Sequence, residues 1–229
     1  MPIGTFVNTA TVIIGSLIGL TLRKKFPDNI KAIIFQGVGL ATLVLGMQMA
    51  LNIHEAKHFL EVIFSLILGG IVGELVHLDA RLEGWGNALK AKIKVGEARF
   101  TEGLVTAFLI FCVGSMTFVG AINEGLSGDR TLIYTKAILD GFTSMALASV
   151  YGVGVLFSAL PLFLVQASLT LLAGQFQAFF SDTIINQMTA VGGALILGIG
   201  LNLLEIKAIK TLNLLPGIFV VVVLVLIFG

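Results

Sequence analysis

Charged residues are scarce in this chain of 229 amino acids, at 12% of the sequence, whereas soluble domains carry about 25%. Hydrophobic residues make up 57%, and the mean hydropathy is +1.03. Most helices built from this composition have no polar face to offer water, so their solvent must be lipid. The sequence excludes an ordinary soluble domain and predicts an all-α polytopic membrane protein, with a single transmembrane domain over residues 1–229.

The sequence also has only one cysteine, no marked excess of acidic or basic residues, and no recognisable catalytic motif. The single Cys112 excludes an intrachain disulfide and, lying in an apolar run, is expected to pack as a small hydrophobic residue. The net charge of +1 gives no indication of a nucleic-acid partner. There is no His-x-x-x-His pair or Gly-x-Ser-x-Gly elbow. We therefore expect no enzymatic activity, no metal and no cofactor, and name the lipid bilayer and a small solute or ion as partners.

Long apolar runs define the expected spans, each of which needs about 20 mostly apolar residues. Eight stretches qualify: 3–22, 31–51, 58–78, 102–122, 134–157, 159–180, 185–204 and 209–228. The first has no basic region before it, which favours a spanning helix over a cleaved signal peptide. The last four are joined by almost no loop, so seven spans is the main alternative to eight.

Basic residues divide unevenly between the two sides of an eight-span arrangement. Eleven fall on one side: Arg23, Lys24, Lys25, Lys31, Arg81, Lys90, Lys92, Lys94, Arg99, Lys207 and Lys210. Three fall on the other: Lys57, Arg130 and Lys136. Because basic loops stay in the cytoplasm, both termini are predicted to be extracytoplasmic.

The longest connection, 79–100, combines apolar positions with lysines. Its apolar residues recur every three or four positions: Leu78, Leu82, Trp85, Leu89 and Ile93. This spacing predicts a basic amphipathic helix lying on the cytoplasmic leaflet, with Trp85 at the level of the headgroups.

A polar stripe runs along the fifth span, and it contains Lys136, Asp140, Thr143 and Ser144. A carboxylate in hydrocarbon costs roughly 3 kcal/mol or more, so Asp140 should face protein or a water-filled cavity. Two interpretations stay open. Asp140 either forms a structural i,i+4 pair with Lys136, or it handles a substrate or a proton.

Other polar residues near the apolar spans complete the set of candidates. The candidates for substrate or ion binding are Asp140, Ser144, Thr143, Asn123, Glu124, Asn8, Gln166, Asn202 and Asn213. The candidates for proton or ion coupling are Asp140, Glu74 and Glu61. Glu74-x-x-His77 matches half of a di-metal motif, but a second copy is missing, so a hydrated pair at the membrane surface is favoured. Asn123 and Glu124 are expected in a turn-rich connection.

Two parts of the sequence are rough copies of each other. Leu43–Leu51 aligns without gaps on Leu195–Leu203, and Val7-Asn8 matches Val165-Gln166 when a short gap is allowed. Spans 1–3 would then correspond to spans 6–8 and cross the membrane in the opposite direction, around a central hairpin of spans 4 and 5. Inverted repeats of this kind are typical of secondary transporters. The small-residue faces could serve a homodimer as readily as an intrachain bundle.

Several motifs resemble those of a known family: Phe111-Cys-Val-Gly-Ser-Met, Gly120-Ala-Ile-Asn-Glu-Gly-Leu-Ser-Gly-Asp129, Lys136-Ala-Ile-Leu-Asp-Gly141, Gly192-Gly193, Gly198-Ile-Gly-Leu-Asn-Leu-Leu204 and Asn213-Leu-Leu-Pro216. Over essentially the whole chain, the sequence resembles the YqgA/YdfK-like bacterial inner-membrane proteins, a domain of unknown function. The family usually has proline where Ser115 stands. The resemblance implies a polytopic protein of the bacterial inner (cytoplasmic) membrane with a transport role.

We expect a transporter of a small solute or ion, which could be proton-coupled through Asp140, because a carboxylate shielded from water can exchange protons near neutral pH. An ion or solute channel lined by the same groups is the first alternative. A membrane scaffold or sensor without flux is the second.

Overall fold

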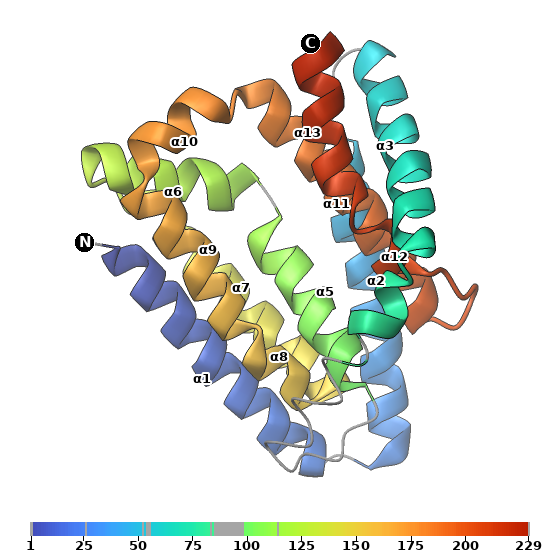
Figure 1. Cartoon of the computed structure of the whole chain (residues 1–229). Helices are drawn as coiled ribbons and strands as arrows, with labels where there is room; N and C mark the ends of the chain where they lie inside the picture. The colour runs from blue at the N-terminus through green and yellow to red at the C-terminus, as the bar shows by residue number, and fades with distance from the viewer. Residues whose placement is uncertain are drawn as a thin grey trace. The chain divides into compact units, whose positions relative to one another are not determined.

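The structure is a computed structural model that describes residues 2–25, 27–51, 53, 56–82, 84, 99–113 and 115–228. Every regular element within these residues is an α-helix (Figure 1), as the sequence predicts. Trp85, Leu89 and Ile93, on which the predicted amphipathic helix depends, lie outside the described residues.

The chain divides into two compact units, and each is built from two separate stretches of the sequence. Unit 1 consists of Met1–Ile34 and Val95–Phe180, and unit 2 consists of Phe35–Lys94 and Ser181–Gly229. The described helices of unit 1 are α1 (Ile3–Lys25), α5 (Phe100–Cys112), α6 (Ser115–Ser127), α7 (Thr131–Tyr151), α8 (Val153–Phe157), α9 (Ala159–Leu171) and α10 (Ala173–Phe179). Those of unit 2 are most of α2 (Asp28–Ala50), α3 (Ala56–Leu75), α11 (Asp182–Leu203), α12 (Thr211–Leu214) and α13 (Gly217–Phe228).

Six helical stretches in the described chain are long and apolar enough to cross a membrane, judged by length and composition. A seventh is added if α5 and α6 count as one bent span. The helix α7, predicted as the fifth span, is not among them, because its polar stripe lowers its hydropathy. The chain thus has about six candidate membrane spans.

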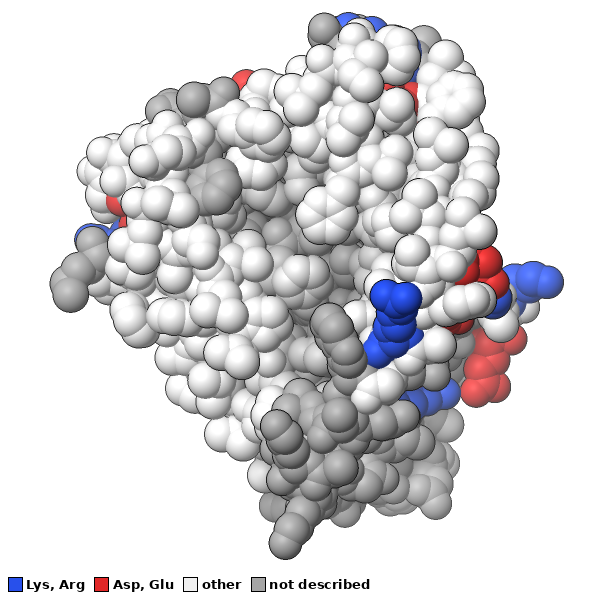
Figure 2. All heavy atoms as spheres, in the orientation of Figure 1, with Lys and Arg blue, Asp and Glu red and all other residues white. Residues whose placement is uncertain are grey.

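The surface agrees with a lipid solvent. Large apolar side chains point outward on both units, with Phe142 68% exposed on α7 and Phe219 73% exposed on α13. In Figure 2 most of the described surface is uncharged, and the charged side chains form a few small groups. In water this much exposed apolar surface would promote aggregation, whereas hydrocarbon accommodates it.

The fourth predicted span is broken. The helices α5 and α6 meet at an angle of 56°. Figure 1 shows the bend between these two green helices. Within the break, the hydroxyl of Thr117 donates a hydrogen bond of 2.8 Å to the carbonyl of Phe111, which has lost its helical partner. The chain bends here although Ser115, and not proline, begins α6. Asn123 and Glu124 lie within α6, so the prediction that they belong to a turn was wrong.

The boundary between the fifth and sixth predicted spans was also wrong. Gly152 has a φ of +83° and ends α7, so residues 153–157 belong to α8 and not to the fifth span. Such a left-handed conformation suits glycine and stops a helix. The last span is interrupted as well, because Pro216 separates α12 from α13.

Glycines allow backbones to touch in each unit. In unit 1, α1 and α7 run parallel, with Gly15 against the carbonyl of Gly141 and Gly19 against that of Met145. In unit 2, Gly73 of α3 lies against the carbonyl of Asn213, so that α3 packs antiparallel to α13. Without a hydrophobic driving force in lipid, helices associate through such close packing.

We predict that Gly15→Ala destabilises the protein by about 1–3 kcal/mol, because the added methyl would collide with the backbone of α7. Thermal unfolding of the purified protein in detergent measures the change. Gly37→Ala is the matched control, since no atom lies within 4 Å of the new methyl. The stated packing role of Gly15 is wrong if both variants melt at the wild-type temperature or above it.

Candidate functional site

A buried polar cluster joins three helices of unit 1 around Asp140 of α7. The ammonium of Lys136, one turn earlier on α7, donates to both carboxylate oxygens, at 2.8 Å to Oδ1 and 2.6 Å to Oδ2. The amide Nδ2 of Asn8 on α1 donates to Asp140 Oδ2 at 3.0 Å and to Gln166 Oε1 on α9 at 3.2 Å. The structure therefore brings Asn8, Asp140 and Gln166 together, three residues that the sequence nominated separately.

The cluster is shielded from solvent and its charges cancel. The side chains of Lys136 and Asp140 are each 6% exposed, and Asn8 and Gln166 are fully buried. Removing such a pair from water is costly, and close contact with added hydrogen bonds is what offsets the cost. Both carboxylate oxygens are bonded, so the charge of Asp140 is fully compensated.

Two amide atoms of the cluster have no hydrogen-bond partner. These are Asn8 Oδ1, an acceptor, and Gln166 Nε2, a donor. Buried polar atoms nearly always have a partner, because each unmade bond costs about 1–3 kcal/mol. Three buried hydroxyls elsewhere on the same two helices also have no partner, those of Thr5, Ser16 and Thr170. The site thus has spare hydrogen-bonding capacity that a small polar ligand or water could use.

The spacing of these residues along the sequence puts the polar groups of the cluster on the facing surfaces of α1 and α7. Thr5, Asn8, Gly15 and Gly19 recur along one face of α1, the face that meets α7 through glycine contacts. On α7 the matching face carries Lys136, Asp140 and Ser144 at intervals of four residues. The small residues let the two backbones approach closely enough for Asn8 to reach the carboxylate.

The break between α5 and α6 lies beside the same pair. The ammonium of Lys136 is 5.9 Å from the ring centre of Phe111, in the last turn of α5. This is cation–π distance, and the C-terminal end of a helix also attracts positive charge. The helix end and the aromatic ring thus add two favourable contacts for the Lys136 ammonium besides the Asp140 carboxylate.

Glu124 has a structural position of its own in unit 1. Its buried carboxylate accepts a 2.7 Å bond from the backbone N–H of Gly4 at the start of α1, and a 3.0 Å bond from Arg130 Nε. An acidic group at a helix N-terminus satisfies a free donor and the helix dipole. Asn123 beside it is half-buried.

The remaining unit 1 candidates lie on α7 near the cluster. Ser144 is fully buried, and its hydroxyl donates to the carbonyl of Gly141 at 2.8 Å. Thr143 is half-buried. Neither makes a hydrogen bond to Asp140 in the described structure.

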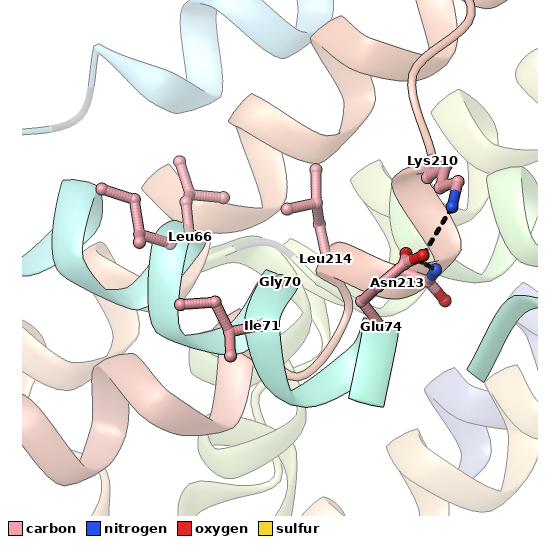
Figure 3. A pocket seen from close by; sticks show the side chains of 8 residues that line it. Leu66, Gly70, Ile71, Glu74, Lys210, Asn213 and Leu214 are labelled. Carbon is pink, nitrogen blue, oxygen red and sulfur yellow. Dashed lines mark hydrogen bonds and ion pairs between the residues drawn. The ribbon is translucent and has the colours of Figure 1, made fainter. Parts of the chain in front are cut away.

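A second polar group lies in unit 2, at the C-terminal end of α3 (Figure 3). Lys210 Nζ and Asn213 Nδ2 each donate a 2.6 Å bond to the carboxylate of Glu74, and Asn213 Oδ1 accepts one of 2.7 Å from the backbone N–H of Asp79. Glu74 raises the pKa of Lys210 by accepting its hydrogen bond. The expected Glu74–His77 face does not form, because α3 ends at Leu75 and His77 has a φ of +51°.

An open pocket of about 510 Å³ adjoins this group. Its walls are apolar side chains of α3 and α12, including Leu66, Ile71 and Leu214, and its polar end is the Glu74 group (Figure 3). The side chains of Glu74 and Lys210 are 54% and 65% exposed, so their ion pair lies at the surface of unit 2.

The other unit 2 candidates have different surroundings. Asn202 bonds both backbone groups of Ile209, at 2.7 and 2.8 Å, and so closes the turn between α11 and α12. Glu61 is 7% exposed, and its Oε2 has no hydrogen-bond partner. Gln187, which the sequence analysis did not single out, is 2% exposed and has an unpartnered Oε1.

Several partners were missed from the sequence, among them Lys210 for Glu74, Gly4 for Glu124, and the ring of Phe111 for Lys136. Each pairing other than the last spans more than 100 positions, so helix periodicity carries no signal for it. Across the residues that the structure describes, no three His, Cys, Asp or Glu side chains gather as a metal site would require.

The apolar helices, their lipid-compatible surfaces and the buried ion pair define a polytopic α-helical membrane protein. Comparison with known families gives a more specific result. Residues 3–226 match the family described as "Protein of unknown function (DUF554)", and the chain belongs to that family. The resemblance noted from the motifs is thereby confirmed.

Two relatives show how far the similarity extends. The chain is 38% identical over 218 residues to the "Uncharacterized membrane protein YdfK" of Bacillus subtilis (strain 168), covering 95% of this chain and 93% of YdfK. It is 28% identical over 226 residues to the "Uncharacterized protein YqgA" of Escherichia coli (strain K12), covering 95% of this chain and 94% of YqgA. No solved structure matches the chain.

For the buried pair, we predict that Lys136→Met lowers the free energy of unfolding by about 3–5 kcal/mol, because it leaves Asp140 charged and unpaired. The double variant Lys136→Met with Asp140→Asn should recover most of this loss, since no buried charge remains. Denaturant unfolding of the four proteins in the double-mutant cycle measures the coupling. Additive losses would contradict a strong interaction between the two side chains.

For the unit 2 group, we predict that Asn213→Ala costs about 1–3 kcal/mol of stability, because the side chain is buried and bonds both Glu74 and Asp79. Lys210→Ala should change the unfolding free energy little, since its ion pair is exposed. Thermal unfolding compares the two variants, and an equal loss for both would contradict the assigned importance of Asn213.

Proposed function

We propose that this protein is a membrane transporter of a small solute or ion, coupled to protons through Asp140. The observation that carries the proposal is the buried Lys136–Asp140 pair, held by Asn8 and surrounded by unpartnered polar atoms. Ionisable residues inside a membrane are costly, and they commonly mark pathways for ions or substrates. A purely structural pair would not need spare donors and acceptors on two neighbouring helices.

The proposal includes eight spans, with α7 as the additional one. Its polar stripe is turned inward against α1, and α1 is itself a candidate span. The two helices run parallel and touch through Gly15 and Gly19, so α7 would cross the bilayer wherever α1 does. With eight spans, the basic residues favour both termini on the extracytoplasmic side of a bacterial cytoplasmic membrane.

The proposal also includes an inverted repeat in which the predicted spans 1–3 correspond to the predicted spans 6–8. Three contacts support it. Asn8 and Gln166, matched as equivalent residues in the sequence, are joined by a 3.2 Å hydrogen bond. In unit 2 the matched segments of α2 and α11 pack antiparallel, with Gly46 against Leu197 and Gly200 against Leu43. Equivalent segments meet in this way when they flank a twofold axis, and secondary transporters place their sites at such an axis.

The test measures proton movement across the membrane. Proteoliposomes holding a trapped pH dye receive an imposed pH gradient, and a panel of sodium, potassium, lithium, chloride and amino-acid solutes is added outside. We predict that at least one solute moves protons with wild-type protein and that Asp140→Asn lowers this rate at least tenfold. The amide resembles the carboxylate in shape but has no charge and takes up no proton, so coupling that depends on the Asp140 carboxylate is lost.

The matched control is Ser149→Ala on the same helix, whose hydroxyl bonds only the carbonyl of Ala146. Its flux should equal that of the wild type. Asp140→Asn must also reconstitute and unfold like the wild type, which excludes a folding defect. Unchanged proton-coupled flux in Asp140→Asn would overturn the coupling role. Flux that ignores the pH gradient would favour a passive carrier if it saturates with solute and a channel if it does not.

A further inference from the structure

We propose that the cluster around Asp140 binds a small monovalent cation, and that the Lys136 ammonium occupies the position of this cation when the site is empty. The inference rests on the proposed function and names the substrate class of the same site. Three points support the inference: Lys136 is the partner of the ion pair that can move, oxygen ligands remain when it leaves, and these ligands together carry one negative charge.

The carboxylate is already fully occupied by a cation of the protein's own. Lys136 bonds both oxygens of Asp140, and Asn8 bonds one of them. An external cation can reach Asp140 only if the ammonium leaves. Equally, an anion can bind Lys136 only if the carboxylate leaves, so the mobility of the two partners decides between the two substrate classes.

Lys136 is the mobile partner. It lies five residues after Thr131, the first residue of α7, which is about 7.5 Å along the helix. Its four-carbon stem allows the ammonium to withdraw toward the end of the helix, as lysines near helix ends do in membranes. Asp140 lies one turn deeper on a single-carbon stem and stays in place. The charge that remains in the site is therefore negative.

The groups left behind provide oxygen ligands. They are the carboxylate of Asp140, the unpartnered Oδ1 of Asn8 and, one turn along α1, the unpartnered hydroxyl of Thr5. Hard cations prefer carboxylate, carbonyl and hydroxyl oxygens of this kind. The unpartnered Gln166 Nε2 cannot ligate a cation, but Gln166 Oε1 orients Asn8 by accepting its hydrogen bond.

The charge of the site matches one positive charge. The helices packed against α7 are α1, α5, α6 and α8, and α9 reaches the cluster through Asn8 of α1. The titratable groups that face the pair from them are Cys112 of α5 and, farther along, Glu124 of α6, which Arg130 already pairs. With one uncompensated carboxylate, a divalent ion would leave a buried positive charge, which the apolar surroundings oppose.

The exchange balances in atoms and charge. The bond between the Lys136 ammonium and Asp140 breaks, the ammonium gives its proton to water, and the cation forms its bond to Asp140. Lysine remains as a neutral amine, so one proton leaves for each cation that enters. Return of a proton to Lys136 reverses the step and releases the cation, which is cation–proton exchange without a net change of charge at the site.

The experiment uses the full chain in detergent with a weak buffer and a pH dye. Sodium, potassium or lithium chloride replaces choline chloride at constant ionic strength. We expect at least one alkali cation to release up to one proton per chain, and choline chloride to release none. Release that instead follows a change of anion at constant choline, or no release with any of the three cations, would overturn the proposal.

Three variants separate cation binding from proton release. Lys136→Gln removes the internal cation from Asp140, so the melting temperature of this variant should rise by several degrees with the effective cation. The double variant Lys136→Gln with Asp140→Asn should lose this shift. Lys136→Arg keeps the ion pair and the fold, but a guanidinium does not deprotonate, so proton release should vanish. A cation-dependent shift of equal size in the double variant would contradict binding at Asp140.

The outcomes also distinguish this inference from the function on which it rests. If Asp140→Asn abolishes proton-coupled flux in proteoliposomes but no alkali cation releases protons, the transport proposal stands and the cation is wrong. If Asp140→Asn leaves the proton-coupled flux unchanged, the proposed coupling through Asp140 fails first, and the cation site fails with it.

Discussion

The ion pair between Lys136 and Asp140 is the constraint on which the architecture of unit 1 depends. A charge buried in an apolar bundle needs an opposite charge and further hydrogen bonds. Here Lys136 supplies the first and Asn8 supplies the second, from a helix that must run alongside α7. The glycines of α1, the broken helix beside Phe111 and the amide of Gln166 are arranged around this requirement.

Helix interruptions in both units lie where polar groups gather. In unit 1, α5 and α6 part beside Lys136, and Thr117 bonds a carbonyl that the break exposes. In unit 2, Pro216 separates α12 from α13, and Asn213, three residues earlier, bonds Glu74 and the backbone of Asp79. Free backbone groups and polar side chains satisfy one another at these positions, which hydrocarbon requires of any non-helical backbone.

The sequence predicts the helices better than their ends, and local pairs better than distant ones. Long apolar runs predicted the long helices of the described chain, because a lipid solvent imposes the same apolar composition on each of them. The four-residue spacing offered a pair of Lys136 and Asp140 as one of two interpretations, and the structure contains that ion pair. The spacing could not predict that Gly152 would end α7 or that α6 would contain Glu124, because glycine and turn-forming residues are tolerated in membrane helices. The contacts of Asn8 with Asp140 and Gln166 depend on how three helices pack, which no spacing encodes.

The glycine contacts between α1 and α7 have a mechanical consequence for unit 1. Two helices whose backbones touch at Gly15 and Gly19 cannot slide past each other without a clash, so Asn8 and Asp140 travel as one rigid piece. The helix α9 packs against the same piece, with the 3.2 Å bond from Asn8 to Gln166 and the ring contact of Phe6 with Phe163 among its contacts. Any rearrangement that exposes Asp140 must therefore move other helices around this pair and cannot separate Asn8 from Asp140.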